Sequence, residues 1–441
     1  MKMKKVLALV LGTTMVASLG LAGCGGSNGE AKEEGEAESS AKKTIKWISV
    51  NPGENGWEGL SKPILEEYEK ETGVHIDAEF YAFNDLFEVI ETKAAAGNAD
   101  FDAMSVDVTF ISKYAESEYL EPLDAYFTDE DKAKWDAASY EAGVWKDTMY
   151  GAPMNTSTQE LYYNKTLLDE AGITIPENDA DHRLTYEQVA DLAKQGLEKL
   201  DPDGTKGMIG LDFQQVSRVY QMNMLPNSKG GANISEDGMS LDGVVNTDAW
   251  IDAMTWYQGL VNDGIASRGY DADQLGDQFY AGKMLFMVGG TWTPSQMQAE
   301  DEIGFTYAPC FEGYEDKVAT STGSWYFGIN KDSEDKEEIA KFIKWFTLEK
   351  GSDMWLKVNG DVPSRVDKQN EIMENPEAAP DMKIAAYEAA NTAVPRAVTP
   401  VFGEYSAVLD QAWEDVRNGA DVKETLDNAI EQFDSATASY K

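Results

Sequence analysis

Apolar and polar residues follow two different patterns along the N-terminal part of the chain, short apolar runs and helical spacing. Short apolar runs such as TIKWISV predict strands, and EGLSKPILEEYEKETG predicts a helix because Leu60, Ile64 and Tyr68 recur on one face. The predicted elements are, in order, strand 44–50, helix 58–73, strand 74–80, helix 85–97 and strand 101–106. This alternation favours an α/β fold with parallel strands joined by crossover helices.

The loops that follow these three strands are the first places to look for a ligand. In sheets of this kind, ligands bind beyond the carboxyl ends of the strands. The loops read NPGENGW, YAFND and DVTF, and they contain Trp57, Asn84 and Asp107. We therefore expect these three residues to contact the ligand.

The same two patterns occur again in the middle of the chain. Helical spacing predicts helices over 185–200 and 248–264, and short apolar runs predict strands at 207–213 and 283–290. A polar loop, NKDSEDKEE, then leads into a predicted helix pair over 339–360. We expect the middle segment to form a second α/β lobe.

The first 23 residues have the layout of a secretion signal. Three lysines precede an apolar span that is too short and too interrupted for a transmembrane helix. Leu-Ala-Gly-Cys at its end resembles the bacterial lipobox, so we expect residues 1–23 to be removed and Cys24 to carry two acyl chains, which stable anchoring requires. A plain signal peptide with an incidental cysteine is the alternative. Residues 24–43 lack large apolar side chains and predict a flexible tether.

Composition bounds the number of domains and the kind of partner. About 400 residues follow the tether, which is more than one hydrophobic core usually holds and indicates two domains. The chain has 37 Lys and Arg against 79 Asp and Glu, a formal net charge of −42. Such a charge repels nucleic acid and anionic membranes, so neither is an expected partner.

Motifs for nucleotide binding and for nucleophilic catalysis are missing from the sequence. It has no phosphate-binding glycine pattern after a strand and no G-x-S-x-G elbow. His75 and His182 have no second ligand-type residue at metal spacing, and Cys310 has no disulfide partner if Cys24 is acylated. We expect no cofactor and no metal, and we expect Cys310 to be a small buried hydrophobe.

Aromatic residues in loops indicate the chemistry of the ligand. Trp57, Trp292 and Trp325 lie in or beside loops with Gly, Asn, Ser or Thr. Flat apolar faces beside neutral hydrogen-bonding groups suit a sugar ring, so the pattern favours a cleft lined by aromatic side chains.

Several segments, taken in order, resemble the bacterial extracellular solute-binding proteins, family 1, which include maltose-binding protein. GAPMNTSTQELYYNKTLLDEAGI is similar to the family's proline-containing crossover, its strand ending in Tyr-Asn-Lys and the helix that follows. FYAGKMLFMVGGTW resembles the family's Phe-x-x-Gly-Lys-x-x-Met stretch, which ends at a pocket Trp. TGSWYFGINKDSEDKEEIAKFIKWF resembles its Gly-Gly-Trp strand, loop and helix, and NGDVPSR its Gly-x-x-Pro. The ordered set covers nearly the whole chain.

The resemblance implies a periplasmic-binding-protein-like fold, with two α/β lobes joined by three crossovers and a ligand cleft between them. The implied boundaries are 44–153 and 327–375 for the N-terminal lobe, 154–326 and 376–441 for the C-terminal lobe, and crossovers near 154–157, 322–326 and 371–378. The implied protein is a monomer and not an enzyme. It is anchored by lipid on the extracellular face of the cell membrane, closes on a saccharide and delivers it to the permease subunits of an ABC transporter.

The resemblance also implies a set of ligand contacts. They are Asn155 and Ser157 on the first crossover, Gln214 and Gln215 from the second lobe, Trp292 as the aromatic platform, Trp325 on the second crossover, and Tyr405. The chain departs from the family after the Ala-Gly helix, where IPENDADHRLTYEQV replaces Pro-Pro-Lys-Thr-Trp, and in the VDVTF loop, so the sugar is left open.

Two other functions stay open at this point. An anchored glycoside hydrolase needs two cleft carboxylates roughly 5 to 10 Å apart. A binding protein for an amino acid or a peptide needs a cleft arginine to hold a carboxylate, for which Arg218, Arg365 and Arg396 are candidates.

Overall fold

The computed structural model describes residues 43–51, 56–97, 100–293 and 302–440. The predicted signal peptide, Cys24 and the tether up to residue 42 lie outside these residues. Among the described helices, none combines the length and the apolar character that crossing a bilayer requires.

The first sheet has five strands in the spatial order β2, β1, β3, β12, β6. Their bounds are β1 Thr44–Val50, β2 His75–Tyr81, β3 Ala103–Asp107, β6 Ala152–Pro153 and β12 Trp325–Ile329. β1 runs parallel to β2 and to β3, which confirms the parallel strands predicted from the strand–helix alternation. β12 runs antiparallel to β3 and β6, so a strand from far along the chain completes this sheet.

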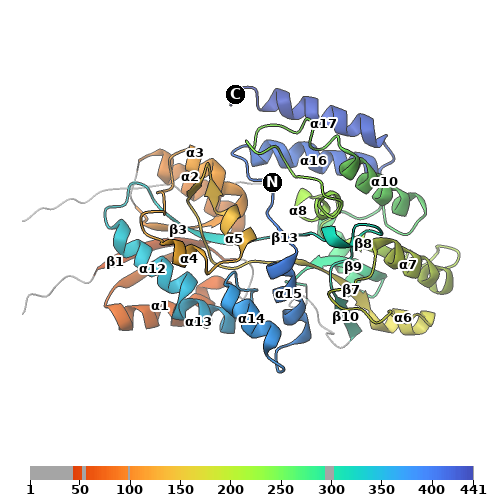
Figure 1. The fold of residues 1–441 in the computed structure, drawn as a ribbon, viewed down its shortest axis with the longest axis horizontal. Coiled ribbons are helices and arrows are strands. Elements are labelled where there is room, and N and C mark those ends of the chain that lie inside the picture. Colours follow the sequence, from red (N-terminus) through yellow and green to blue (C-terminus); the bar gives the residue numbers. More distant parts are fainter. Residues whose placement is uncertain (1–42, 52–55, 98–99, 294–301, 441) are drawn as a thin grey trace, which may run out of the picture. The chain divides into compact units, whose positions relative to one another are not determined.

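Helices pack against the first sheet and close its core (Figure 1). The main ones are α1 Trp57–Thr72, α2 Phe83–Ala95, α12 Lys336–Leu348 and α13 Lys350–Asn359. Trp47 on β1 is fully buried, and its ring packs on Phe327 of β12 at 5.1 Å and on Phe346 of α12 at 5.8 Å. α1 ends at Gly73, whose φ of 77° is the left-handed conformation that glycine adopts at low cost. The shorter elements that follow β3 are η1 Val108–Phe110, α3 Ile111–Glu116, α4 Asp129–Lys132, α5 Ala137–Ala142, β4 Val144–Trp145 and β5 Thr148–Met149.

The second sheet has four strands in the order β10, β7, β9, β8. Their bounds are β7 Gln159–Asn164, β8 Ile209–Phe213, β9 Met284–Gly290 and β10 Ile303–Thr306. β8 and β9 run parallel, and β7 runs antiparallel to both β9 and β10. The sequence predicted both β8 and β9, and the structure confirms them.

A separate hydrophobic core surrounds the second sheet. Its helices are α6 Lys165–Ala171, α7 Tyr186–Leu200, α8 Val219–Met222, α9 Met224–Asn227, α10 Asp248–Asn262, α11 Ala272–Tyr280, α16 Phe402–Arg417 and α17 Val422–Ala436. Thr185 and Gln188 cap the start of α7 reciprocally, a local signal for a helix N-terminus. Later in α7, a Cβ on Gly196 would lie 2.0 Å from Leu285 of β9, so glycine allows this helix to approach the sheet.

Three segments of the chain pass between the two sheets. Residues 154–158 connect β6 to β7, and residues 322–324 connect β11 Thr320–Ser321 to β12. The third segment joins α14 Val366–Glu374 to α15 Pro380–Asn391, and α15 contacts β7 and β10 of the second sheet. The strand β13 Ala393–Val394 then pairs in parallel with β11, so β13 lies beside the second segment.

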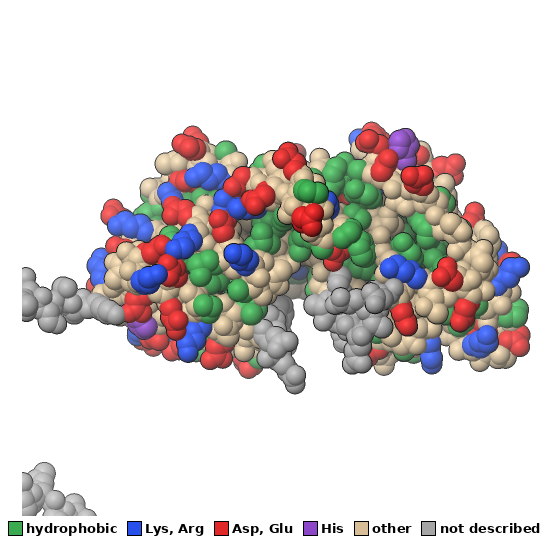
Figure 2. Space-filling view, turned by 90° about the horizontal axis from the view of Figure 1, so that it is seen from below, with side chains coloured by type: hydrophobic (Ala, Val, Ile, Leu, Met, Phe, Trp, Pro, Cys, Tyr) green, Lys and Arg blue, Asp and Glu red, His purple; other side chains and the backbone are tan. Residues whose placement is uncertain are grey.

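The second half of the chain also holds the one free cysteine that the structure describes. Cys310 is 1% exposed, and burial raises the pKa of its thiol. Its predicted role as a small buried hydrophobe is confirmed. Charged side chains of both signs are interspersed over the face seen in Figure 2, so on this face the acidic excess is not gathered into one patch.

Candidate functional site

A cavity of about 400 Å³ lies at the edge of the second sheet where β8 and β9 end. Because these strands are parallel, the residues that follow them meet at the same edge, which is the expected place for a ligand. The cavity is lined by Gln214, Gln215, Arg218, Ala272, Gly276, Asp277, Tyr280 and Trp292. The structure thus brings together three of the predicted site residues, Gln214, Gln215 and Trp292.

The Gln214 side chain is held in the wall of this cavity by several hydrogen bonds. The backbone N–H of Gln214 donates to Val288 of β9 at 2.9 Å, and its side-chain oxygen accepts from the N–H of Gly290 at 3.3 Å. Its side-chain nitrogen donates to the Tyr280 hydroxyl at 3.1 Å. The side chain is 6% exposed, so Gln214 joins β8, β9 and α11 and holds the cavity wall in place.

Trp292 forms a flat apolar wall of the cavity. Its half-buried ring is stacked on Tyr220 of α8, with the ring centres 5.9 Å apart and the planes at 21°. A Cβ on Gly290 would lie 2.0 Å from the Trp292 ring, so the glycine at the end of β9 allows the indole to fold back over the strand. The contact of Gly290 with the Trp292 ring therefore explains the glycine that precedes Thr291 and Trp292 in the GGTW sequence.

Tyr220 connects the Trp292 ring to the segments that pass between the sheets. Its hydroxyl is 2.9 Å from the Ser157 hydroxyl on the first segment. Ser157 donates to the carbonyl oxygen of Gly323 at 2.9 Å and accepts from its N–H at 3.0 Å, on the second segment. A Cβ on Gly323 would lie 2.3 Å from the Tyr220 hydroxyl, so only glycine fits at this contact.

Arg396, which follows β13, extends the same group of contacts to the first sheet. Its guanidinium lies over the Tyr220 ring, 4.7 Å from the ring centre. It also donates to the carboxylate of Asp107, at the end of β3, at 3.0 Å. Asp107 therefore contacts the residues that follow β13, and through Arg396 it is linked to Tyr220 and Trp292.

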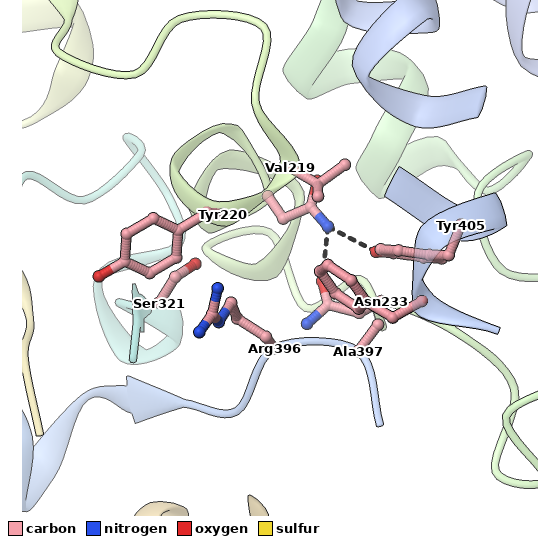
Figure 3. Close-up of a pocket in the computed structure, with 9 residues that line it drawn as sticks. Val219, Tyr220, Asn233, Ser321, Arg396, Ala397 and Tyr405 are labelled. Atoms are coloured by element: carbon pink, nitrogen blue, oxygen red, sulfur yellow. Dashed lines mark hydrogen bonds between the residues drawn. The ribbon is translucent and has the colours of Figure 1, made fainter. Parts of the chain in front are cut away.

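Tyr405 lines a different gap from the cavity with Trp292, together with Arg396 and Tyr220 (Figure 3). It is fully buried, and its hydroxyl accepts from the side-chain amide of Asn223 at 2.6 Å. Burial raises the pKa of Tyr405, so the phenol is neutral at physiological pH. The gap that Tyr405 lines with Arg396 and Tyr220 has no room for a water molecule.

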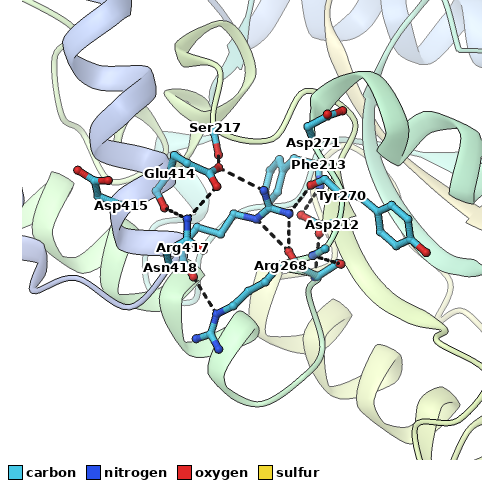
Figure 4. Close-up of polar contacts among 12 residues, drawn as sticks. Asp212, Phe213, Ser217, Arg268, Tyr270, Asp271, Glu414, Asp415, Arg417 and Asn418 are labelled. Atoms are coloured by element: carbon cyan, nitrogen blue, oxygen red, sulfur yellow. Dashed lines mark hydrogen bonds and ion pairs between the residues drawn. The ribbon is translucent and has the colours of Figure 1, made fainter.

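A buried network supports the helix that carries Tyr280. Arg417, 2% exposed at the end of α16, donates to the carbonyl oxygens of Ser267 and Tyr270, just before α11 (Figure 4). The N–H of Ser267 donates to Asp212 of β8 at 3.0 Å. Burial raises the pKa of Asp212 to about 6. The loop that leads into α11 is therefore held between α16 and β8.

The predicted tryptophans of the first sheet have different environments. Trp57 is 5% exposed and packs on Trp325 at 5.5 Å and on Trp355 at 5.0 Å, which gives it a packing role. Trp325 is half-buried, and its ring lies parallel to Phe87, with the centres 6.2 Å apart. Phe87 in turn stacks on Phe110 at 4.2 Å. Trp325 is therefore the more accessible of the two predicted aromatic contacts.

Asn155 joins two of the segments that pass between the sheets. Its side-chain oxygen accepts from the N–H of Trp325 at 3.0 Å, and its nitrogen donates to Asp361. Trp355 also donates to Asp361, at 3.2 Å. Burial raises the pKa of Asp361 to about 6. Asn155 is 7% exposed, so the contacts that the structure gives it are with the protein itself.

The remaining candidates are Asn84, Arg365 and Arg218, and of these Arg218 lies at the cavity. Asn84 is in α2, but its side chain lies outside the described part. Arg365 pairs with Asp353 at 3.1 Å and with Asp367 at 2.5 Å, beside α13 and α14, whereas Arg218 lines the cavity with Trp292. Within the described residues, no group of three or more His, Cys, Asp and Glu side chains could hold a metal ion.

Sequence reasoning missed Tyr220, Tyr280 and Gly323. Tyr220 sits in the unremarkable stretch SRVYQM, and Tyr280 lies on an ordinary amphipathic helix. Only contacts between distant segments bring them to the site. For Gly323, the TGSW sequence held a signal, since a glycine beside a predicted crossover indicates a close approach of other atoms.

Comparisons with known proteins agree on one family. Residues 54–353 match the family model of bacterial extracellular solute-binding proteins. A galactooligosaccharide-binding protein of Bacillus subtilis is 25% identical, and the alignment covers 98% of this chain and 97% of that protein. Relatives in Brucella abortus, named as binding proteins without a stated ligand, are 26% identical over 54% of this chain, and the match spans only 57% of their length.

A solved structure agrees with this result at the level of the fold. The cyclic alpha-maltosyl-1,6-maltose binding protein of Arthrobacter globiformis has a TM-score of 0.76 to this chain. The superposition covers 90% of this chain and 99% of that one, at 19% sequence identity. At this identity, the similarity shows a shared arrangement of two α/β lobes.

Proposed function

Since the chain belongs to the bacterial extracellular solute-binding protein family, we propose that it is the substrate-binding protein of an ABC importer and that its ligand is a saccharide. The family resemblance and the two-lobed α/β fold predicted from the sequence are both confirmed. One observation carries the proposal of a saccharide. The cavity at the ends of β8 and β9 combines the face of Trp292 with the amides of Gln214 and Gln215 and the Tyr280 hydroxyl.

These groups match the chemistry of a sugar. A sugar ring has apolar C–H faces that stack on an indole, and its hydroxyls both donate and accept hydrogen bonds, as amides and phenols do. The names of the Bacillus and Arthrobacter proteins support the same class of ligand, since both bind oligosaccharides. We propose Trp292, Gln214, Gln215, Ser157 and Trp325 as ligand contacts, and Asn84 and Asp107 as further members of the predicted set. Trp57, Asn155 and Tyr405 are buried against other protein groups, which favours a supporting role for them.

The two alternatives differ in their support from the structure, since of the three candidate arginines Arg218 lines the cavity. Among the described residues that line the cavity, Asp277 is the one carboxylate, whereas a glycoside hydrolase needs a pair across the scissile bond. Capture of an amino acid or a peptide needs an arginine that is available to a carboxylate. Arg365 and Arg396 each already pair with aspartate. We therefore propose a binding protein without enzymatic activity, and the ligand panel below tests Arg218 by including amino acids and peptides.

We further propose that the lobes close on the ligand by rotation about the three connecting segments. The N-terminal lobe would comprise 44–153 and 327–375, and the C-terminal lobe 154–326 and 376–441. The contacts of Ser157 with Tyr220 and Gly323 support this proposal, because they join the ligand cavity to two of the segments that must bend. A ligand that contacts both lobes favours the closed arrangement by its extra affinity for that state.

The proposed cellular context rests on the sequence of the leader. Residues 1–23 would be removed, Cys24 would carry the lipid, and 24–43 would hold a monomeric binding domain near the permease on the extracellular face of the cell membrane. The membrane contact would be made only by the lipid, because the net charge of −42 disfavours direct binding to anionic lipid.

The proposal is tested with a panel of neutral oligosaccharides, acidic oligosaccharides, amino acids and short peptides. Thermal shift identifies binders, because a ligand at 100 times its Kd stabilises the folded state by about 2.7 kcal/mol. Calorimetric titration then gives the Kd, and chromatography of a long incubation detects cleavage. We expect at least one neutral oligosaccharide to bind and to be recovered intact. Binding of amino acids or peptides alone, or cleavage that co-purifies with the protein, would replace this function by one of the two alternatives.

A further inference from the structure

An ion pair lies beside the candidate site. Arg396 donates to Asp107 at 3.0 Å, and Arg218 and Asp277 line the cavity itself. The Asp107 and Arg396 side chains are only 11% and 14% exposed, so water screens their charges weakly. The charges of Asp107 and Arg396 therefore compensate each other, although the whole chain is strongly acidic.

Asp107 is held in one position by its own loop. One of its carboxylate oxygens accepts from the N–H of Thr109 at 3.0 Å and from the Thr109 hydroxyl at 2.8 Å. The same oxygen accepts from Arg396. The N–H of Thr109 starts the short helix η1, so the carboxylate caps that helix. Its position follows from the fold of β3 and η1, and Arg396 reaches across to it.

Arg396 depends on Asp107 for the compensation of its charge. Its Nε atom is buried and has no hydrogen-bond partner among the described residues. The gap beside it, between Tyr220, Ser321 and Tyr405, is too narrow for a water molecule (Figure 3). The other contact of the guanidinium is the face of Tyr220, at 4.7 Å. Without the Asp107 carboxylate, a nearly buried cation would stand next to the ring on which Trp292 stacks.

We propose that Asp107 is a specificity-determining residue that restricts the site to uncharged saccharides by neutralising Arg396. The inference rests on the proposed function, because it concerns the ligand of the same site. A uronate or other acidic sugar would meet the fixed carboxylate of Asp107 and would find the guanidinium already paired. Repulsion of the wrong ligand is a common source of specificity, and a paired arginine offers an incoming carboxylate little gain.

The test exchanges the charge of Asp107 while keeping its shape. Asp107→Asn keeps an oxygen for the N–H of Thr109 but leaves Arg396 without a counter-charge. Trigalacturonate is the acidic probe and maltotriose is the neutral one, both titrated by calorimetry at low salt into the full chain carrying Cys24→Ala. We expect Asp107→Asn to bind trigalacturonate at least about 10-fold more tightly than the parent chain, a difference of about 1.4 kcal/mol. The double variant Asp107→Asn with Arg396→Gln should lose this gain.

Matched controls separate charge selection from general damage. Asp191→Asn removes the same formal charge from an exposed position on α7 and should leave trigalacturonate binding as in the parent. Asp107→Ser, which can still cap η1, should repeat the gain if Asp107→Asn folds poorly. The inference is overturned if the parent binds trigalacturonate as tightly as Asp107→Asn, or if neither Asp107 variant gains affinity for it. Failure of every neutral oligosaccharide in the panel would refute the proposed function, and the trigalacturonate comparison would still decide the role of Asp107.

Discussion

The substitution Trp292→Ala should separate ligand binding from stability. Trp292 is half-buried, and its ring contact with Tyr220 is of the kind that contributes about 0.5 to 1.5 kcal/mol beyond area burial. Truncation of a fully buried Trp costs about 3 to 5 kcal/mol, so a half-buried one should cost about 2 kcal/mol of unfolding free energy. Loss of the stacking face should cost about 2 kcal/mol of binding, which corresponds to roughly 30-fold in affinity.

Trp256→Ala is the matched control for this experiment. Trp256 is also half-buried, on α10 of the same sheet's core, where it packs on Tyr186 and on Phe311 at 5.2 Å each. Its loss should lower the melting temperature by a similar amount and leave the Kd unchanged. Calorimetric titration with a panel ligand and thermal melts on the same preparations measure both quantities. A Trp292→Ala protein that melts far lower than Trp256→Ala but keeps the parental Kd would refute the role of Trp292 as a platform.

Three further predictions concern the Tyr220 hydroxyl, two buried carboxyl groups and the lipid anchor. Tyr220→Phe removes the hydroxyl that lies 2.9 Å from the Ser157 hydroxyl but keeps the ring. The affinity for the ligand should fall by about 1 kcal/mol, or roughly 5-fold. A calorimetric Kd equal to the parent's would show that the hydroxyl has no part in binding. Burial raises the pKa of Asp212 and Asp361 from 3.8 to about 6. Ionising these groups in the folded state therefore lowers the free energy of unfolding. This loss is absent below about pH 4, grows between pH 4 and pH 6 and is complete above pH 6. The melting temperature should therefore fall as the pH rises from about 4 to 6. A melting temperature that rises over this interval would contradict the prediction. Cys24→Ala should move the full chain from the detergent phase to the aqueous phase when the parent and the variant are produced in a lipoprotein-processing host. Equal recovery of the parent and the variant in the aqueous phase would rule out the lipid anchor.

The regular elements could be predicted from the sequence because their signals are local. Strand 44–50 coincides with β1, and the helix predicted over 185–200 begins one residue earlier than α7. Period, capping residues and chain length define such elements without reference to the rest of the fold. The place of β12 and β6 in the first sheet could not be predicted in this way, because β6 has only two residues and pairs with a strand far along the chain.

The candidate site was accessible to sequence reasoning only in part. Gln214, Gln215 and Trp292 follow strands that the sequence predicts, so the edge of the sheet brings them together. Trp57 was placed beside a loop correctly, but its burial depends on Trp355, whose position no local pattern reveals. Arg396 was one of three candidate arginines, and only the folded chain distinguishes it through its contacts with Asp107 and Tyr220. Tertiary contacts of this kind carry no local sequence signal.

The burial of Cys310 makes the protein suitable for conversion into a fluorescent sensor. A chain with Cys24→Ala keeps one thiol, and that thiol is 1% exposed with a pKa raised by burial, so maleimide reagents should leave it unmodified. A cysteine introduced at an exposed rim position such as Asp277 would then be the single labelling site. An environment-sensitive dye attached there would change its emission when a solute enters beside Trp292. The dye would report binding in real time, and Cys310 would stay unmodified.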